Sequence, residues 1–119
     1  VLMDPSGLVD EIPEDLMDAA GTLSGCGPAY AYMFLNALCD GAVLRGVPRQ
    51  KARQYAAQML LGSARMVLES GKHPEALKDD VCSPGGSTIA GVRALEAHGF
   101  RSAVMEALDA AVTRSKELG

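Results

Sequence analysis

The sequence predicts an all-α fold, a bundle of about five helices with a short extended segment at the N-terminus. Three observations favour this fold. Apolar residues recur at helical spacing over long stretches, and Gly and Pro stand at the boundaries between those stretches. Aromatic residues make up only 4% of the chain and Trp is absent, so Ala, Leu, Val, Met and Gly must fill the core. Such small and flexible side chains favour closely packed helices.

The composition is that of one folded domain. The chain has 119 residues, of which 48% are hydrophobic and 22% charged, which excludes a disordered chain. The net charge is −4 and no basic stripe is present, which argues against a nucleic-acid partner. No apolar run reaches the roughly 18 residues that a membrane-spanning helix needs, so no membrane association is expected.

The cysteines and histidines do not form a metal-binding pattern. There are three cysteines, an odd number, and they have no C-x-x-C spacing: Cys26, Cys39 and Cys82. The two histidines, His73 and His98, are far from the cysteines in the chain, whereas a zinc motif needs its ligands at short, regular spacings. The pattern predicts no metal site and reduced thiols, as in a cytoplasm or an organelle matrix. Each thiol is interpreted as small apolar filler; a reactive thiol beside a glycine turn is the alternative.

The N-terminal part of the chain is expected to lead into a helix. Residues 7–13 alternate loosely in polarity and predict a short strand or extended segment that ends at Pro13. A helical turn over residues 13–20 would end near Gly21. A glycine turn at residues 24–28 would then open a helix from Pro28 to Arg45.

The helix from Pro28 to Arg45 has an unusual distribution of polarity. Between Ala29 and Leu44 its only clearly polar side chains are Asn36 and Asp40, which lie four residues apart on one face. A helix that is apolar nearly all round must be buried on most sides. Since a domain of this size has few places to bury one, the sequence predicts a partner chain.

Four more helices are expected after this one. Residues 48–70 form a long amphipathic helix that Gly71 ends, and residues 73–81 form a short helix with Pro74 near its start. Residues 87–98 form a helix closed by Gly99, and residues 100–118 form the last one.

The stretch CSPGGSTIAG, residues 82–91, joins two of these helices and is the strongest candidate site. Gly85 and Gly86 allow a ligand to approach the backbone closely. The first turn of the following helix has N–H groups without internal partners and a partial positive charge, which suit a carboxylate or phosphate. Ser87 and Thr88 would add hydroxyls there. The alternative is that these hydroxyl residues only cap the helix.

The glycine turn at residues 24–28 is a weaker candidate. Its G-x-G spacing lacks the strand–helix–strand unit and the further glycine of a dinucleotide-binding fingerprint. If a nucleotide binds, its main binding domain is not in this chain.

At both glycine segments the sequence resembles one enzyme family, pyrroline-5-carboxylate reductase. The stretch LSGCGPAYAYMFLNAL is similar to that family's LSGSGPAY helix, and residues 74–96 resemble its signature throughout. Residues 60–74 and EDLMDAAGTLSG, residues 14–25, also resemble it. The resemblance covers roughly residues 8–118, with several blocks in the family's order. Cys26 stands where serine is common in the family.

The resemblance implies a domain organisation. The family's enzymes have a Rossmann domain for NADPH or NADH, followed by an all-helical dimerisation domain that interlocks with a second copy. In many members the dimers assemble into decamers. Residues 1–13 would then be a remnant of the last strand, or the linker, of the upstream nucleotide-binding domain. Residues 14–119 would be the helical dimerisation and substrate-binding domain.

The resemblance also implies roles for particular residues. The family reduces 1-pyrroline-5-carboxylate to L-proline, the last step of proline biosynthesis. The substrate would be held by four residues, with backbone N–H groups at the last three receiving its carboxylate: Ser83, Gly86, Ser87 and Thr88. The Thr88 hydroxyl would reach the ring nitrogen and take part in catalysis. The nicotinamide end of the cofactor would be bordered by Ser24, Gly25, Gly27 and Pro28.

Two other functions fit the same residues. One is a non-enzymatic helical dimerisation module, and the other is a related cyclic-imine reductase on the same scaffold. A cytoplasmic location is expected, with a mitochondrial one as the alternative, and the chain alone is expected to be inactive without its Rossmann domain.

Overall fold

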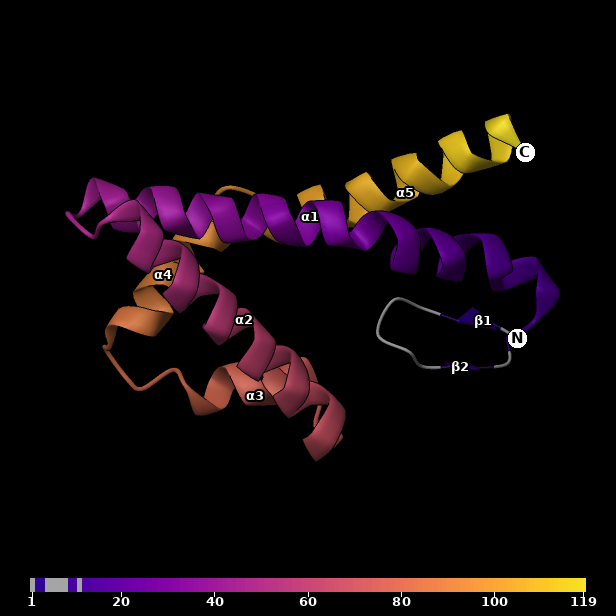
Figure 1. Ribbon diagram of the computed structural model, residues 1–119. Coiled ribbons are helices and arrows are strands. Elements are labelled where there is room, and N and C mark those ends of the chain that lie inside the picture. Colours follow the sequence, from indigo (N-terminus) through magenta and orange to yellow (C-terminus); the bar gives the residue numbers. More distant parts are fainter. Residues whose placement is uncertain (1, 4–8, 11) are drawn as a thin grey trace. The chain divides into compact units, whose positions relative to one another are not determined.

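The computed structural model describes residues 2–3, 9–10 and 12–119 of the chain. It confirms an all-α fold with five α-helices in the described residues, plus one short helical turn and one small pair of strands (Figure 1). The chain divides into two units, residues 1–33 with 100–119, and residues 34–99. The elements are β1 (Leu2–Met3), β2 (Val9–Asp10), the 3₁₀ turn η1 (Glu14–Leu16), α1 (Met17–Leu44), α2 (Arg49–Ser70), α3 (Pro74–Asp80), α4 (Ser87–Ala97) and α5 (Phe100–Leu118).

The extended segment predicted for residues 7–13 is confirmed where the structure describes it. Val9–Asp10 forms β2, which pairs antiparallel with β1 so that Leu2 lies opposite Asp10. Gly7, Leu8 and Glu11 lie outside the described residues. The assignment of residues 1–13 to an upstream domain stays a prediction.

The predicted break between residues 21 and 28 is wrong, because α1 runs without interruption from Met17 to Leu44 and contains Pro28 in its interior. Pro28 removes one N–H from the helix and costs about 3 kcal/mol, and each interior glycine costs about 1 kcal/mol. Ending the helix and restarting it would instead leave four carbonyls and four N–H groups without helical partners. The continuous helix therefore prevails over the local turn signals, and the predicted glycine turn does not exist.

The unit formed by residues 34–99 begins with a sharp reversal between α1 and α2. Gly46 has a φ of 101°, which favours glycine, and the Val47 N–H donates to the Ala42 carbonyl at 3.0 Å. Arg49 on α2 donates to Asp40 on α1 at 2.7 Å, which ties the two helices together across the turn.

The remaining helices begin and end where the Gly and Pro residues predict. Gly71 ends α2 with a φ of 68°, and its N–H donates to the Val67 carbonyl at 3.2 Å. His73 caps α3, because its Nδ1 accepts the Glu75 N–H at 3.0 Å. Gly99, with a φ of 69°, separates α4 from α5.

In the other unit, α5 is linked to α1 by a side chain. The Tyr30 hydroxyl, on α1, donates to the Ala107 carbonyl on α5 at 3.4 Å, and both residues are half-buried. The bond joins segments 77 positions apart in the chain. It places α5 beside the N-terminal half of α1.

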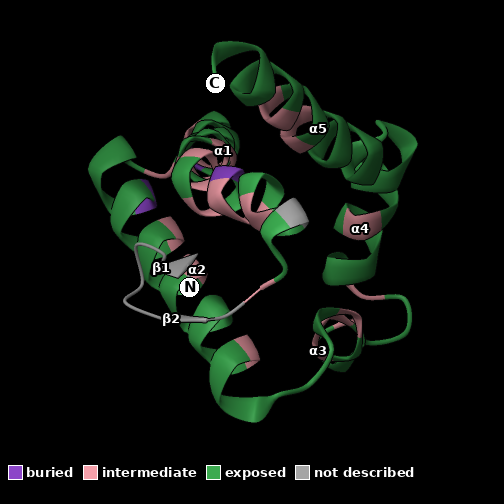
Figure 2. Ribbon diagram, turned by 90° about the vertical axis from the view of Figure 1, so that its right-hand side faces the viewer, coloured by how far each residue is buried: buried purple, intermediate pink, exposed green. Residues whose placement is uncertain are grey.

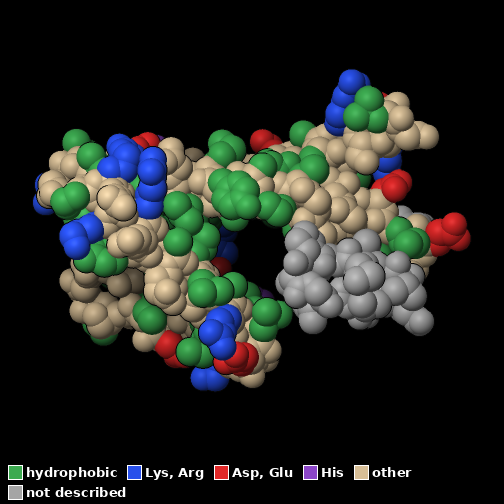
Figure 3. All heavy atoms as spheres, viewed as in Figure 1, with side chains coloured by type: hydrophobic (Ala, Val, Ile, Leu, Met, Phe, Trp, Pro, Cys, Tyr) green, Lys and Arg blue, Asp and Glu red, His purple; other side chains and the backbone are tan. Residues whose placement is uncertain are grey.

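The chain covers little of its own apolar surface. Among the described residues the buried apolar side chains are Cys39 and Ala52, and Figure 2 shows most of every helix exposed. Tyr32 and Met33 on α1 are 70% and 71% exposed, and apolar side chains gather at the surface over that helix (Figure 3). Among the described residues, this helix therefore keeps much of its apolar surface exposed.

Candidate functional site

Residues 83–86 form a tight turn between α3 and α4. The Gly86 N–H donates to the Ser83 carbonyl at 3.1 Å, which closes the four-residue turn. Pro84 is the second residue and Gly85, with a φ of 70°, is the third, which is the pattern of a type II turn. Any side chain at position 85 would be strained by this backbone angle.

The helix α4 begins directly after this turn, with Gly86 as its N-cap. Gly86 has no side chain, and the N-cap makes no side-chain hydrogen bond. Ser87 and Thr88 are the first two helical residues and both are exposed. The alternative that these hydroxyls serve as the helix cap is therefore wrong, since the N-cap position is one residue earlier.

The N-terminus of α4 is chemically suited to an anion. The N–H groups of the first helical turn lack helical acceptors and carry the positive end of the helix dipole. Three backbone donors were expected for a carboxylate, at Gly86, Ser87 and Thr88. The Gly86 N–H already donates within the turn, so the N–H groups of Ser87 and Thr88 are the two that remain available to a ligand. The four predicted substrate-binding residues lie together here: Ser83, Gly86, Ser87 and Thr88.

The end of α3 holds the turn in place. The Cys82 N–H donates to the Asp79 carbonyl at 3.0 Å, and the Val81 N–H donates to the Lys78 carbonyl at 3.1 Å. The Lys78 ammonium lies 2.9 Å from the Glu75 carboxylate and 3.6 Å from that of Asp79. The hydrogen bond to Glu75 raises the pKa of Lys78 above 10.5.

The residues predicted to border the cofactor lie in the interior of α1, in the other unit of the chain: Ser24, Gly25, Gly27 and Pro28. A Cβ built on Gly25 or Gly27 would meet nothing within 4 Å, so space is open there. Pro28 has no N–H, so the Ser24 carbonyl lacks its helical partner. This face can accept a flat ring closely but offers no backbone N–H groups to phosphates, because those groups are used within the helix.

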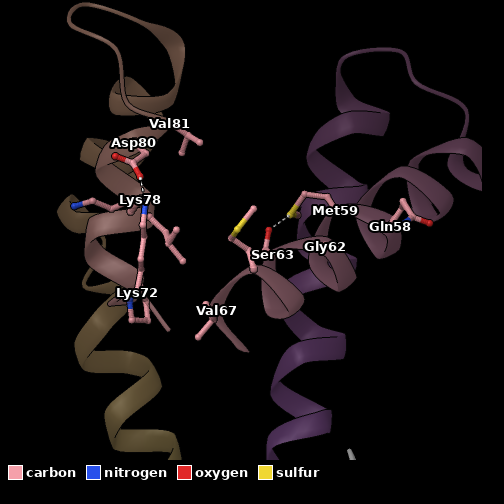
Figure 4. A pocket seen from close by; sticks show the side chains of 12 residues that line it. Gln58, Met59, Gly62, Ser63, Val67, Lys72, Lys78, Asp80 and Val81 are labelled. Carbon is pink, nitrogen blue, oxygen red and sulfur yellow. Dashed lines mark hydrogen bonds and ion pairs between the residues drawn. The ribbon is translucent and has the colours of Figure 1, made fainter. Parts of the chain in front are cut away.

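One feature of the site region was missed by the sequence analysis. A groove of about 700 Å³ lies between α2 and α3 and is lined mainly by apolar side chains. Met59, Ser63 and Val67 face it from α2, while Lys78 and Val81 lie on its other side (Figure 4). The Ser63 hydroxyl donates to the Met59 sulfur at 3.6 Å. In the sequence, the apolar stripe along residues 48–70 is the signal that could have indicated this side of the groove.

The described part of the chain offers no site for a metal and no helix suited to a bilayer. No three His, Cys, Asp or Glu side chains gather there closely enough to hold an ion. No helix in that part is both long enough and apolar enough to cross a membrane. All three cysteines are free thiols; Cys39 is buried, and Cys26 and Cys82 are half-buried.

Two solved structures that share this fold are reductases. The chain superimposes on the Plasmodium falciparum pyrroline carboxylate reductase with NADP bound, with a TM-score of 0.88 and 42% identity, covering 95% of this chain and 43% of that one. It also superimposes on a pyrroline-5-carboxylate reductase from Coxiella burnetii, with a TM-score of 0.89 and 38% identity, over 95% of this chain and 42% of the other.

Curated relatives agree with the structures. The chain is 53% identical to human pyrroline-5-carboxylate reductase 2 over 117 residues, which are 98% of this chain and 37% of the relative. It is 51% identical to the Escherichia coli pyrroline-5-carboxylate reductase over 94% of this chain and 42% of that protein. The chain thus spans about two fifths of the length of these relatives. The family model for pyrroline-5-carboxylate reductase dimerisation matches residues 14–118, and the chain belongs to that family.

Proposed function

We propose that this chain is the dimerisation and substrate-binding part of a pyrroline-5-carboxylate reductase, which reduces 1-pyrroline-5-carboxylate to L-proline with NADPH or NADH. The observation that carries the proposal is the N-terminus of α4. It follows a closed turn, has a bare glycine as its N-cap, and presents Ser87 and Thr88 in its exposed first turn. This arrangement suits a small carboxylate.

The substrate's own chemistry fits these donors. Its carboxylate would accept hydrogen bonds from the N–H groups of Ser87 and Thr88, and the Ser83 hydroxyl lies next to the N-cap Gly86. The ring nitrogen lies two bonds from the carboxylate carbon, so a carboxylate held at this helix end brings the nitrogen within reach of the Thr88 hydroxyl. The helix thereby fixes both the position and the orientation of the ring.

The reaction needs a hydride and a proton. The nicotinamide cofactor, when bound, supplies the hydride to the carbon of the C=N bond. The ring nitrogen takes up one proton and becomes an amine. Thr88 orients that nitrogen and passes a proton from water, since a hydroxyl alone is a poor acid. Most of the rate enhancement would come from positioning.

The cofactor is expected to touch this chain only at its nicotinamide end. The open space at Gly25 and Gly27 leaves room for a flat ring beside Ser24 and Pro28. Since the helix interior has no N–H groups to offer to phosphates, the remainder of the cofactor needs a nucleotide-binding domain outside this chain. NADP in the Plasmodium falciparum relative supports a nicotinamide cofactor.

The exposed apolar surface supports assembly with a second copy. Tyr32 and Met33 would be covered in a homodimer, and further assembly to a decamer is proposed on the same family grounds. A cytoplasmic or mitochondrial location is proposed for the complete enzyme, with no membrane or nucleic-acid partner.

A turnover assay tests the proposal. NADPH oxidation is followed by absorbance with pyrroline-5-carboxylate as substrate, using the chain joined to the nucleotide-binding domain of its natural gene product. Turnover by the joined protein, and none by residues 1–119 alone, is the expected result. A folded joined protein without turnover on either NADPH or NADH would overturn the proposal. Turnover on six-membered cyclic imino acids alone would identify a related imine reductase.

A further inference from the structure

Gly85 and Gly86 are adjacent, but the structure requires glycine at the two positions for different reasons. Gly85 has a φ of 70°, a backbone conformation that other residues rarely adopt. Gly86 has a φ of −83° and a ψ of 178°, which any residue adopts readily. The Gly86 N–H donates to the Ser83 carbonyl, so this N–H is not available to a ligand. Neither the backbone angle nor the N–H explains why position 86 is glycine.

The reason lies in the space that a side chain at position 86 would occupy. A Cβ built on Gly86 would lie 2.6 Å from the Ser83 Oγ and 3.3 Å from the Ser83 carbonyl oxygen. Contacts as short as 2.6 Å do not occur between such atoms, so either the hydroxyl or the new methyl group would have to move. The Ser83 hydroxyl therefore occupies the place that a side chain on the N-cap of α4 would take.

We propose that Gly86 is a positioning residue that acts through Ser83: its missing side chain lets the Ser83 hydroxyl lie against the N-cap of α4. The inference rests on the proposed function, because the hydroxyl is there to bind the substrate carboxylate. It replaces the role that the family resemblance implies for Gly86, that of a direct carboxylate donor.

The consequence of adding a methyl group at position 86 follows from rotamer geometry. The Ser83 hydroxyl would turn to another staggered position about its Cα–Cβ bond, which displaces its oxygen by about 2 Å. A hydrogen bond to a charged carboxylate would then be lost, which corresponds to roughly a ten- to hundred-fold rise in KM. Because the carboxylate is bound equally in the ground state and the transition state, kcat should change little.

A double-mutant cycle in the complete enzyme tests this inference. Ser83→Ala and Gly86→Ala are each expected to raise the KM for pyrroline-5-carboxylate by a similar factor, with kcat within about twofold of wild type. The double variant should have the KM of Ser83→Ala alone, since an alanine at position 86 then meets no hydroxyl. Effects that multiply, or a Gly86→Ala enzyme with wild-type KM, would overturn the inference.

Gly91→Ala is the matched control. Gly91 is a glycine of the same helix, and a Cβ there would meet nothing within 4 Å, so this variant should keep the wild-type KM. Thermal unfolding of all variants separates a changed site from a damaged fold.

A crystal structure of the Gly86→Ala enzyme tests the steric relationship without any assay. The Ser83 Oγ is expected in a different rotamer from wild type, and an unchanged rotamer would contradict the inference. If the wild-type enzyme shows no turnover with pyrroline-5-carboxylate, the proposed function fails, and this comparison still decides whether Gly86 positions Ser83.

Discussion

Arg49 and Asp40 join α1 to α2, with the Arg49 Nη1 2.7 Å from the Asp40 Oδ1. Asp40 is one of the two polar residues on the apolar part of α1, and it lies four residues before the end of that helix. The pair closes the helical hairpin between Leu44 and Arg49. The Asp40 carboxylate, a polar group on an otherwise apolar stretch of helix, thus has an ion-pair partner in the same chain.

Removing this ion pair is expected to have a small effect on stability. The Arg49 and Asp40 side chains are 43% and 57% exposed, so water screens their attraction. Arg49→Ala should lower the free energy of unfolding by about 0.2–1 kcal/mol at low salt, and by less at 1 M salt. Urea unfolding of the complete protein at both salt concentrations measures this. Arg65→Ala is the control, because it removes an ion pair within α2, to Glu69 at 3.6 Å, and not one between two helices. A loss above about 3 kcal/mol, as for a buried pair, would contradict this account.

Thr88 is expected to matter for catalysis and not for folding. It is exposed in the first turn of α4, so Thr88→Ala removes a hydroxyl without opening a cavity. Turnover of the complete enzyme should fall about 10²- to 10⁴-fold, the usual range for a group that assists proton transfer. Size-exclusion chromatography should show an unchanged oligomer. Thr88→Ser, which keeps the hydroxyl, should recover much of the rate; wild-type turnover in Thr88→Ala would remove this residue from the mechanism.

Gly85→Ala should destabilise the fold through the backbone. The φ of 70° at this position costs a residue with a Cβ about 1–2 kcal/mol. Gly85→Asn should cost less than Gly85→Ala, because asparagine tolerates this conformation better. Chemical denaturation of the three proteins gives the comparison. Equal stability of wild type and Gly85→Ala would mean that the turn has another geometry in solution.

Lys78 should titrate above the ordinary range of a lysine. The hydrogen bond that the Lys78 ammonium donates to the Glu75 carboxylate is the largest cause that raises the pKa of Lys78 above 10.5. A raised folded-state pKa means that the pairing stabilises α3 fully below the unfolded-state value, and that this stabilisation is lost as pH rises through the folded-state pKa. Glu75→Gln should lower the pKa of Lys78, as measured by nitrogen NMR of its ammonium group. An unchanged titration would show that Glu75 does not hold the ammonium.

Glycine and proline explain both where the sequence predicted the fold well and where it failed. Gly71 and Gly99 follow helices whose last turns they close with a positive φ, so the boundaries of α2, α4 and α5 could be predicted. The same residue types at Gly25, Gly27 and Pro28 suggested a turn, but strong helix formers on both sides keep α1 continuous. The cost of two additional helix ends therefore outweighs the local preference of these residues for a turn.

Residue types alone predicted a turn before α4 and named it as a candidate anion site. The structure confirms the turn, while anion binding there stays a prediction. Residue types could not show that Gly86 rather than Ser87 is the N-cap, nor that the Gly86 N–H closes the turn. The distance between the Ser83 hydroxyl and a side chain at position 86 depends on a rotamer, which only coordinates provide.

A crystal structure of the complete enzyme with L-proline bound tests the proposed site most directly. The proline carboxylate is expected within hydrogen-bond distance of the Ser87 and Thr88 N–H groups, with the ring nitrogen beside the Thr88 hydroxyl. Proline bound away from the α4 N-terminus, with those N–H groups facing water, would rule out the proposed binding mode.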